Sequence, residues 1–206
     1  LQNNTLQGEA LLPYLLPSRN RVQDTGETGR DKFVLKCDFD QNLESKFEFL
    51  GQILGTAVRH DIVTGLNLTS LVWSPFTQEP LRQKDLAEID DGFVHRLKEL
   101  EHIDEKVPME ILNDETLFSE ALNYPKFVIN SSEENEILLL PNGDKVDVTL
   151  NNRYEYIWLA ERYRVLESSK ALIALHKGLS NVLPVEIFPL FTSDELEEMV
   201  SCLIFT

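Results

Sequence analysis

The side chains that could act as nucleophiles are two cysteines. Cys37 lies in Lys-Cys-Asp and Cys202 in Ser-Cys-Leu. The two are far apart and show no CxxC or Cys/His ligand spacing, so neither a disulfide framework nor a zinc site is indicated. We interpret both as structural cysteines of a protein kept in a reducing compartment, the cytoplasm or the nucleus.

Histidines and adjacent carboxylates are the other groups that could perform acid and base chemistry. No nucleophile elbow, HExxH motif or glycine-rich phosphate loop surrounds any of the four histidines. These are His60, His95, His102 and His176. The pairs Asp90-Asp91 and Glu197-Glu198 fit a helix cap and a solvated face better than a general acid and base. The sequence therefore predicts no catalytic residue, no metal site and no cofactor.

The charge balance narrows the range of partners. The 206 residues carry 35 acidic against 19 basic side chains, a net charge of −16. Such a surface repels phosphate backbones and anionic lipid, so nucleic acid is not an expected partner, whereas a basic protein patch matches it. The longest apolar runs, such as residues 137–140, are far shorter than the ~20 residues of a membrane helix. We expect no membrane insertion.

The elements that must position these groups begin with an irregular segment over residues 1–30. An apolar patch from Leu11 to Leu16 is interrupted by Pro13, and the polar stretch from Ser18 to Arg30 predicts an exposed loop. The next residues, 33–38, alternate between apolar and polar types, which predicts a short strand.

Helical periodicity begins near Leu43, and one face carries Phe47, Leu50, Leu54, Ala57 and Val58. Gly51 and Gly55 interrupt this helix, and we expect a neighbouring backbone to approach closely there. A second helix is predicted over residues 66–76, closed by Pro75 and Pro80.

A third helix is predicted to begin near Asp85 and to restart at Asp90 or Asp91. Its apolar stripe consists of Phe93, Leu97 and Leu100, and such a stripe is more often core than a partner-binding face.

The second half of the chain predicts a hairpin and two further helices. Residues 136–140 and 145–150 flank a turn centred on Asn142-Gly143, a dipeptide typical of tight hairpins. One long helix is predicted over residues 151–181. Thr192 and Glu195 have the spacing of a capping box, which starts the last helix at Thr192.

Several of these segments, in this order, resemble the N-terminal lobe of HECT-type ubiquitin-protein ligases over about residues 33–200, closest to the large multi-domain branch. The residues concerned are Phe-Glu-Phe-Leu-Gly-Gln-Ile-Leu-Gly-Thr-Ala (47–57), Leu-Ala-Glu-Ile-Asp (86–90), Asn152-Arg153-x-Glu155-Tyr156, and Leu190-Phe191-Thr192 with Glu195-Leu196-Glu197.

The resemblance implies a mostly helical α+β fold in which a small conjugating-enzyme-binding subdomain contains a β-hairpin. The divisions that it suggests are an irregular segment at 1–30, a partial larger subdomain at 31–103, the smaller subdomain at 104–182 and a C-terminal helix at 183–206. In the family, ubiquitin passes from a conjugating enzyme to a cysteine in a separate catalytic lobe and then to a substrate lysine. Neither cysteine here has that Thr-Cys-Phe-like context, so we expect this piece alone to be inactive and substrates to bind through other regions.

The resemblance also implies a docking groove for the conjugating enzyme. By position, the groove residues are Phe93, Arg96, Leu97, Leu100, Tyr154, Tyr156 and Ala160. Tyr154 stands where the family usually has lysine, and Ala160 where it usually has a large aromatic residue. The alternative function is a non-catalytic interaction module derived from a truncated ligase.

Overall fold

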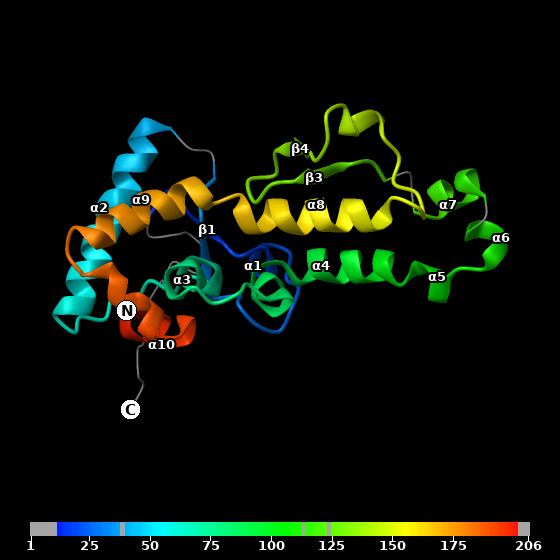
Figure 1. Cartoon of the computed structure of the whole chain (residues 1–206). Helices are drawn as coiled ribbons and strands as arrows, with labels where there is room; N and C mark the ends of the chain where they lie inside the picture. The colour runs from blue at the N-terminus through cyan, green and yellow to red at the C-terminus, as the bar shows by residue number, and fades with distance from the viewer. Residues whose placement is uncertain (1–11, 38–39, 113, 123–124, 202–206) are drawn as a thin grey trace, which may run out of the picture. The chain divides into compact units, whose positions relative to one another are not determined.

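The computed structural model describes residues 12–37, 40–112, 114–122 and 125–201 (Figure 1). They divide into two compact units: unit 1 comes from the residues before Gly92 and after Glu167, and unit 2 is Gly92–Glu167. This division differs from the predicted boundaries at 104 and 182. Among these residues no helix is long and apolar enough to cross a membrane.

Unit 1 opens with a small antiparallel sheet. Strand β1 (Leu15–Pro17) pairs with β2 (Phe33–Leu35) so that Leu16 faces Val34. The predicted strand is confirmed at β2. The predicted exposed loop at 18–30 is right only in part: residues 23–30 are irregular and mostly exposed, but helix α1 (Arg19–Val22) precedes them and the Asn20 side chain is fully buried.

Helices α2 (Gln41–Arg59) and α9 (Ser169–Ser180) pack side by side in unit 1 (Figure 1). The Asp40 carboxylate accepts a hydrogen bond from the Leu43 N–H at 2.6 Å and starts α2. The predicted close approach of a backbone is confirmed at Gly51, where a Cβ would lie 2.2 Å from the Leu175 carbonyl oxygen, but at Gly55 the close neighbour is the Val182 side chain. A Cβ on Gly178 would lie 1.9 Å from the Glu48 carbonyl oxygen.

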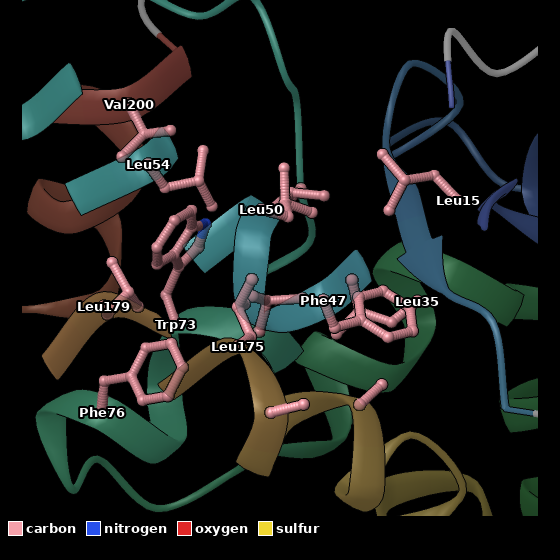
Figure 2. Close-up of a cluster of buried hydrophobic side chains, with 14 of the residues drawn as sticks. Leu15, Leu35, Phe47, Leu50, Leu54, Trp73, Phe76, Leu175, Leu179 and Val200 are labelled. Carbon is pink, nitrogen blue, oxygen red and sulfur yellow. The ribbon is translucent and has the colours of Figure 1, made fainter. Parts of the chain in front are cut away.

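The core of unit 1 is built on this helix pair (Figure 2). The labelled side chains converge from α2, α9, the β1–β2 sheet and the neighbouring helices: Leu15, Leu35, Phe47, Leu50, Leu54, Trp73, Phe76, Leu175, Leu179 and Val200. Trp73 and Phe76 meet edge to face with ring centroids 6.3 Å apart. Both belong to α3 (Ser70–Thr77), which therefore contributes two aromatic side chains to the core.

Two predicted helix boundaries near α3 have different outcomes. The predicted end at Phe76 lies one residue from the observed end of α3 at Thr77, but Pro75 lies inside the helix and does not close it; the helix ends where Gln78 adopts a left-handed conformation. The predicted restart is confirmed, because α4 (Gln83–Glu101) is broken at Asp90, whose φ of −151° and ψ of 73° are not helical.

The C-terminal part of unit 1 contains a 3₁₀ segment, Val185–Leu190, and helix α10 (Ser193–Ser201). The predicted capping box is confirmed. The Thr192 N–H donates to the Glu195 carboxylate at 2.8 Å, and the Glu195 N–H donates to the Thr192 hydroxyl at 3.2 Å. Cys202 lies outside the described residues.

Unit 2 places helix α8 (Arg153–Leu166) between the second half of α4 and a β-hairpin (Figure 1). The short helices Ile103–Lys106 (α5), Met109–Leu112 (α6) and Glu115–Ala121 (α7) follow α4. The interior of the unit comprises Leu100, Ile103, Leu112, Phe118, Phe127 and Val148.

The hairpin has a different partner from the one predicted. Strand β4 (Glu136–Leu138) pairs with β3 (Val128–Asn130), not with residues 145–150. Asn142 is left-handed, as an Asn-Gly turn requires, but it leads into a 3₁₀ turn at Gly143–Lys145. The hairpin turn lies instead at 131–135, where the Ser131 hydroxyl accepts hydrogen bonds from the Glu133 and Asn135 N–H groups.

The single long helix predicted over 151–181 is also wrong, because α8 and α9 are separate. Two side-chain contacts favour the break at Glu167–Ser168. The Glu167 carboxylate accepts a hydrogen bond from the Ser132 N–H at 3.2 Å, and the Ser168 hydroxyl donates to the Leu35 carbonyl oxygen at 3.2 Å. These residues therefore bond to other segments, and the chain leaves unit 2 here.

Candidate protein-docking site

The residues predicted to form a docking groove all lie in unit 2, and four of them are buried in it. Phe93, Leu97 and Leu100 from α4 are 5%, 4% and 8% exposed, and Ala160 from α8 is 0% exposed. The guanidinium of Arg164 lies over the Phe93 ring, 4.9 Å from its centroid. These four apolar side chains are therefore part of the interior of unit 2.

Tyr154, in the first turn of α8, is an exposed aromatic residue with a fixed position. Its side chain is 54% exposed, while the Arg153 guanidinium stacks 4.3 Å from the ring centroid and donates to the Tyr154 hydroxyl at 2.9 Å. Arg153 is itself anchored by the Leu150 carbonyl oxygen at 2.7 Å and the Asp104 carboxylate at 3.1 Å. The ring therefore presents apolar area to solvent with little rotamer freedom left to lose.

Tyr156 faces the hairpin on another side of α8. Its ring meets Phe127 edge to face at 5.5 Å, and its hydroxyl is 3.5 Å from the Val128 carbonyl oxygen. Burial raises the pKa of Tyr156, and the positive charge of Arg96 partly opposes that rise. Arg96 is exposed on α4, so its charge acts across the surface between the two helices.

Sequence reasoning missed Trp158, one turn beyond Tyr154. Its side chain is 55% exposed, and the Arg162 guanidinium stacks 5.1 Å from the ring. Tyr154, Trp158 and Arg162 are spaced four residues apart and therefore follow one another along one face of α8. That spacing is the signal that could have found them. We call these three residues the aromatic stripe.

Comparison with known proteins decides the family. The profile of the HECT-domain (ubiquitin-transferase) family matches residues 14–203. The chain belongs to the HECT-domain family. The resemblance inferred from the sequence is confirmed, and so is the predicted α+β, mostly helical class.

The chain spans only a small share of the length of the ligases that it matches. It is 33% identical over 193 residues to human E3 ubiquitin-protein ligase HERC2, covering 92% of this chain but 4% of that protein. It is 29% identical over 191 residues to a putative E3 ubiquitin-protein ligase of Plasmodium falciparum, 2% of that protein. Human HACE1, also an E3 ubiquitin-protein ligase, is 29% identical over 156 residues, 75% of this chain and 16% of HACE1.

Proposed function

We propose that this chain is part of a HECT-type ubiquitin-protein ligase in which unit 2 docks a ubiquitin-conjugating enzyme, so that ubiquitin reaches substrate lysines. Membership of the HECT family supports the ubiquitin-transfer reaction. The docking role rests on the seven aligned residues, which all fall within unit 2.

The observation that carries the docking proposal is the exposed and immobilised ring of Tyr154. Binding hot spots are enriched in tyrosine, tryptophan and arginine, and they cost least when their side chains are ordered in advance. Tyr154 meets both conditions, since it is 54% exposed and held by Arg153 through stacking and a 2.9 Å hydrogen bond.

The buried members of the predicted groove have a supporting role in this proposal. Phe93, Leu97 and Ala160 set the spacing of α4 and α8, which determines where Arg96 and Tyr154 reach the surface. The conjugating enzyme would then contact Arg96, Tyr154 and the accessible part of Tyr156. Truncating a buried member would weaken docking only by loosening unit 2.

The test measures binding of an uncharged conjugating enzyme by calorimetry. We expect Tyr154→Ala to weaken binding by at least ~10-fold, about 1.4 kcal/mol, as for a hot-spot residue. Tyr154→Phe keeps the ring and is expected to stay within ~3-fold of wild type. Leu166→Ala is the matched control, because Leu166 is also exposed on α8, three turns away. Equal affinity of Tyr154→Ala and Leu166→Ala, with both folded, would refute the docking site.

A second assay distinguishes the ligase proposal from the alternative, an interaction module that transfers no ubiquitin. Conjugating enzyme charged with ubiquitin is mixed with this chain, and the products are resolved without reductant. We expect no reducible ubiquitin adduct on this chain, because neither Cys37 nor Cys202 has the family's Thr-Cys-Phe-like context. A persistent adduct at either cysteine would assign transfer to this chain itself. The ligase reading further requires that the parent protein form such an adduct elsewhere.

A further inference from the structure

Helix α4 is interrupted where the chain passes from unit 1 into unit 2. Asp90, one residue before the first segment of unit 1 ends at Asp91, has a φ of −151° and a ψ of 73°, while the residues on both sides are helical. In an uninterrupted helix, the Asp91 N–H would donate to the Ala87 carbonyl oxygen, four residues earlier. A sharp break of this kind needs a physical cause, and proline is not present in this helix.

The side-chain amide of Asn20 occupies the break. The Asp91 N–H donates to Asn20 Oδ1 at 2.7 Å. Asn20 Nδ2 donates in turn to the carbonyl oxygens of Ala87 at 2.8 Å and Glu88 at 3.0 Å. One amide thus links the donor and the acceptor that would otherwise meet within α4. Insertion of a side chain into the helical ladder is a recognised cause of a kink.

Asn20 belongs to α1, and the loop that follows this helix helps to hold the side chain in the break. Asn20 is fully buried, and its Nδ2 also donates to the Thr28 carbonyl oxygen at 3.2 Å. Gly29 has a φ of +68°, and a Cβ at this position would lie 1.8 Å from the Glu88 carbonyl oxygen. Arg19 pairs with the Asp90 carboxylate at 3.5 Å. The loop therefore contacts the backbone of the break directly, and only glycine fits at 29.

We propose that Asn20 is a positioning residue that keeps the backbone of α4 broken at Asp90. Residues 83–89 and 91–101 are helical on each side. Closing the ladder between Ala87 and Asp91 would join them into one straight helix. The break is therefore an element with two arrangements, and the Asn20 amide selects the broken one. This inference does not depend on the docking proposal.

The test uses the full chain and two variants that act differently on the same contact. Asn20→Ala removes the inserted amide, and Gly29→Ala pushes the intact loop away from Glu88. Val22→Ala is the matched control, because Val22 lies on α1 but is 60% exposed. NMR reports the backbone conformation of Asp90 through its Cα shift, and hydrogen exchange reports protection of the Asp91 amide.

We expect both variants to move the Asp90 Cα shift into the helical range, with Asp91 exchange within ~3-fold of wild type because Ala87 becomes its acceptor. A non-helical Asp90 shift with at least ~10-fold faster exchange would show that Asn20 only fills space, and would overturn the proposal. The Val22→Ala control should keep the non-helical Asp90 shift; a helical shift in the control as well would also overturn the proposal.

Discussion

Replacing Gly178 with alanine tests the crossing of α2 and α9, on which the core of unit 1 depends. The added Cβ would lie 1.9 Å from the Glu48 carbonyl oxygen and 3.0 Å from the Gly51 Cα, and ordinary contact begins at 3.4 Å. The two backbones must therefore separate by about 1.5 Å at the crossing, the difference between 3.4 and 1.9 Å. A flexible side chain could move aside, but these atoms belong to backbone.

Two opposing terms give the expected magnitude. Overpacking against backbone costs about 3 kcal/mol, the upper part of the usual range. Alanine in place of glycine inside a helix returns up to ~1 kcal/mol. Gly178→Ala should therefore lower the free energy of unfolding by about 2 kcal/mol, which corresponds to a fall in Tm of ~4–8 °C for a chain of this size.

Gly55→Ala is the matched control, since its Cβ would meet the Val182 side chain at 3.0 Å rather than backbone. We expect it to stay within ~0.5 kcal/mol of wild type, because strain and helix propensity nearly cancel. The assay is denaturant unfolding followed by fluorescence of Trp73, which is 2% exposed in unit 1, in a Trp158→Phe background. Equal stability of Gly178→Ala and Gly55→Ala would refute the close crossing.

Two other predictions concern a helix start and a buried phenol. Thr192→Ala removes the capping box and should lower the free energy of unfolding, measured in a denaturant titration, by ~1 kcal/mol. Thr192→Ser should restore most of this loss. An unchanged free energy of unfolding in Thr192→Ala would show that the box does not stabilise α10. Burial raises the pKa of Tyr156 from its ordinary value of 10.0, so its stabilising contribution is complete below that pH and is lost as pH rises through the folded-state pKa. Tyr156→Phe should therefore lose less stability than wild type between about pH 8 and about pH 11, and equal losses in the two proteins would contradict the assignment.

Sequence patterns correctly predicted those elements that are specified by residues close together in the chain. The apolar face from Phe47 to Val58 and the Thr192–Glu195 box need no distant partner, and both are confirmed. The hairpin failed because Asn142-Gly143 specifies a turn without specifying its partner strand. The turn that forms is stabilised by the Ser131 hydroxyl. It places Glu134 at a φ of +64°, a left-handed conformation that a glutamate in the sequence does not predict.

The sequence predicted which face of each helix the candidate site residues share, but not whether that face is buried or exposed. Periodicity put Phe93, Leu97 and Leu100 on one stripe, but a buried stripe and a binding stripe have the same period. Their burial depends on α8. The end of this helix at Leu166 was not predicted, because the helical pattern of the sequence continues past it. The ordering of Tyr154 by Arg153 depends on Leu150 and Asp104, and this arrangement cannot be read from spacing.

The division of the chain also constrains the order in which it can fold during synthesis. Unit 2 is one continuous stretch, whereas α2 and its partner α9 in unit 1 are separated by the whole of residues 92–167. The ribosome must therefore release all of unit 2 before α9 exists to cover α2. Early collapse of unit 2 would shorten the effective loop between the two helices and reduce the entropy lost when they meet. Until α9 has been synthesised, the face of α2 that carries Gly51 and Gly55 stays exposed to solvent. The nascent chain therefore needs protection longest at this surface.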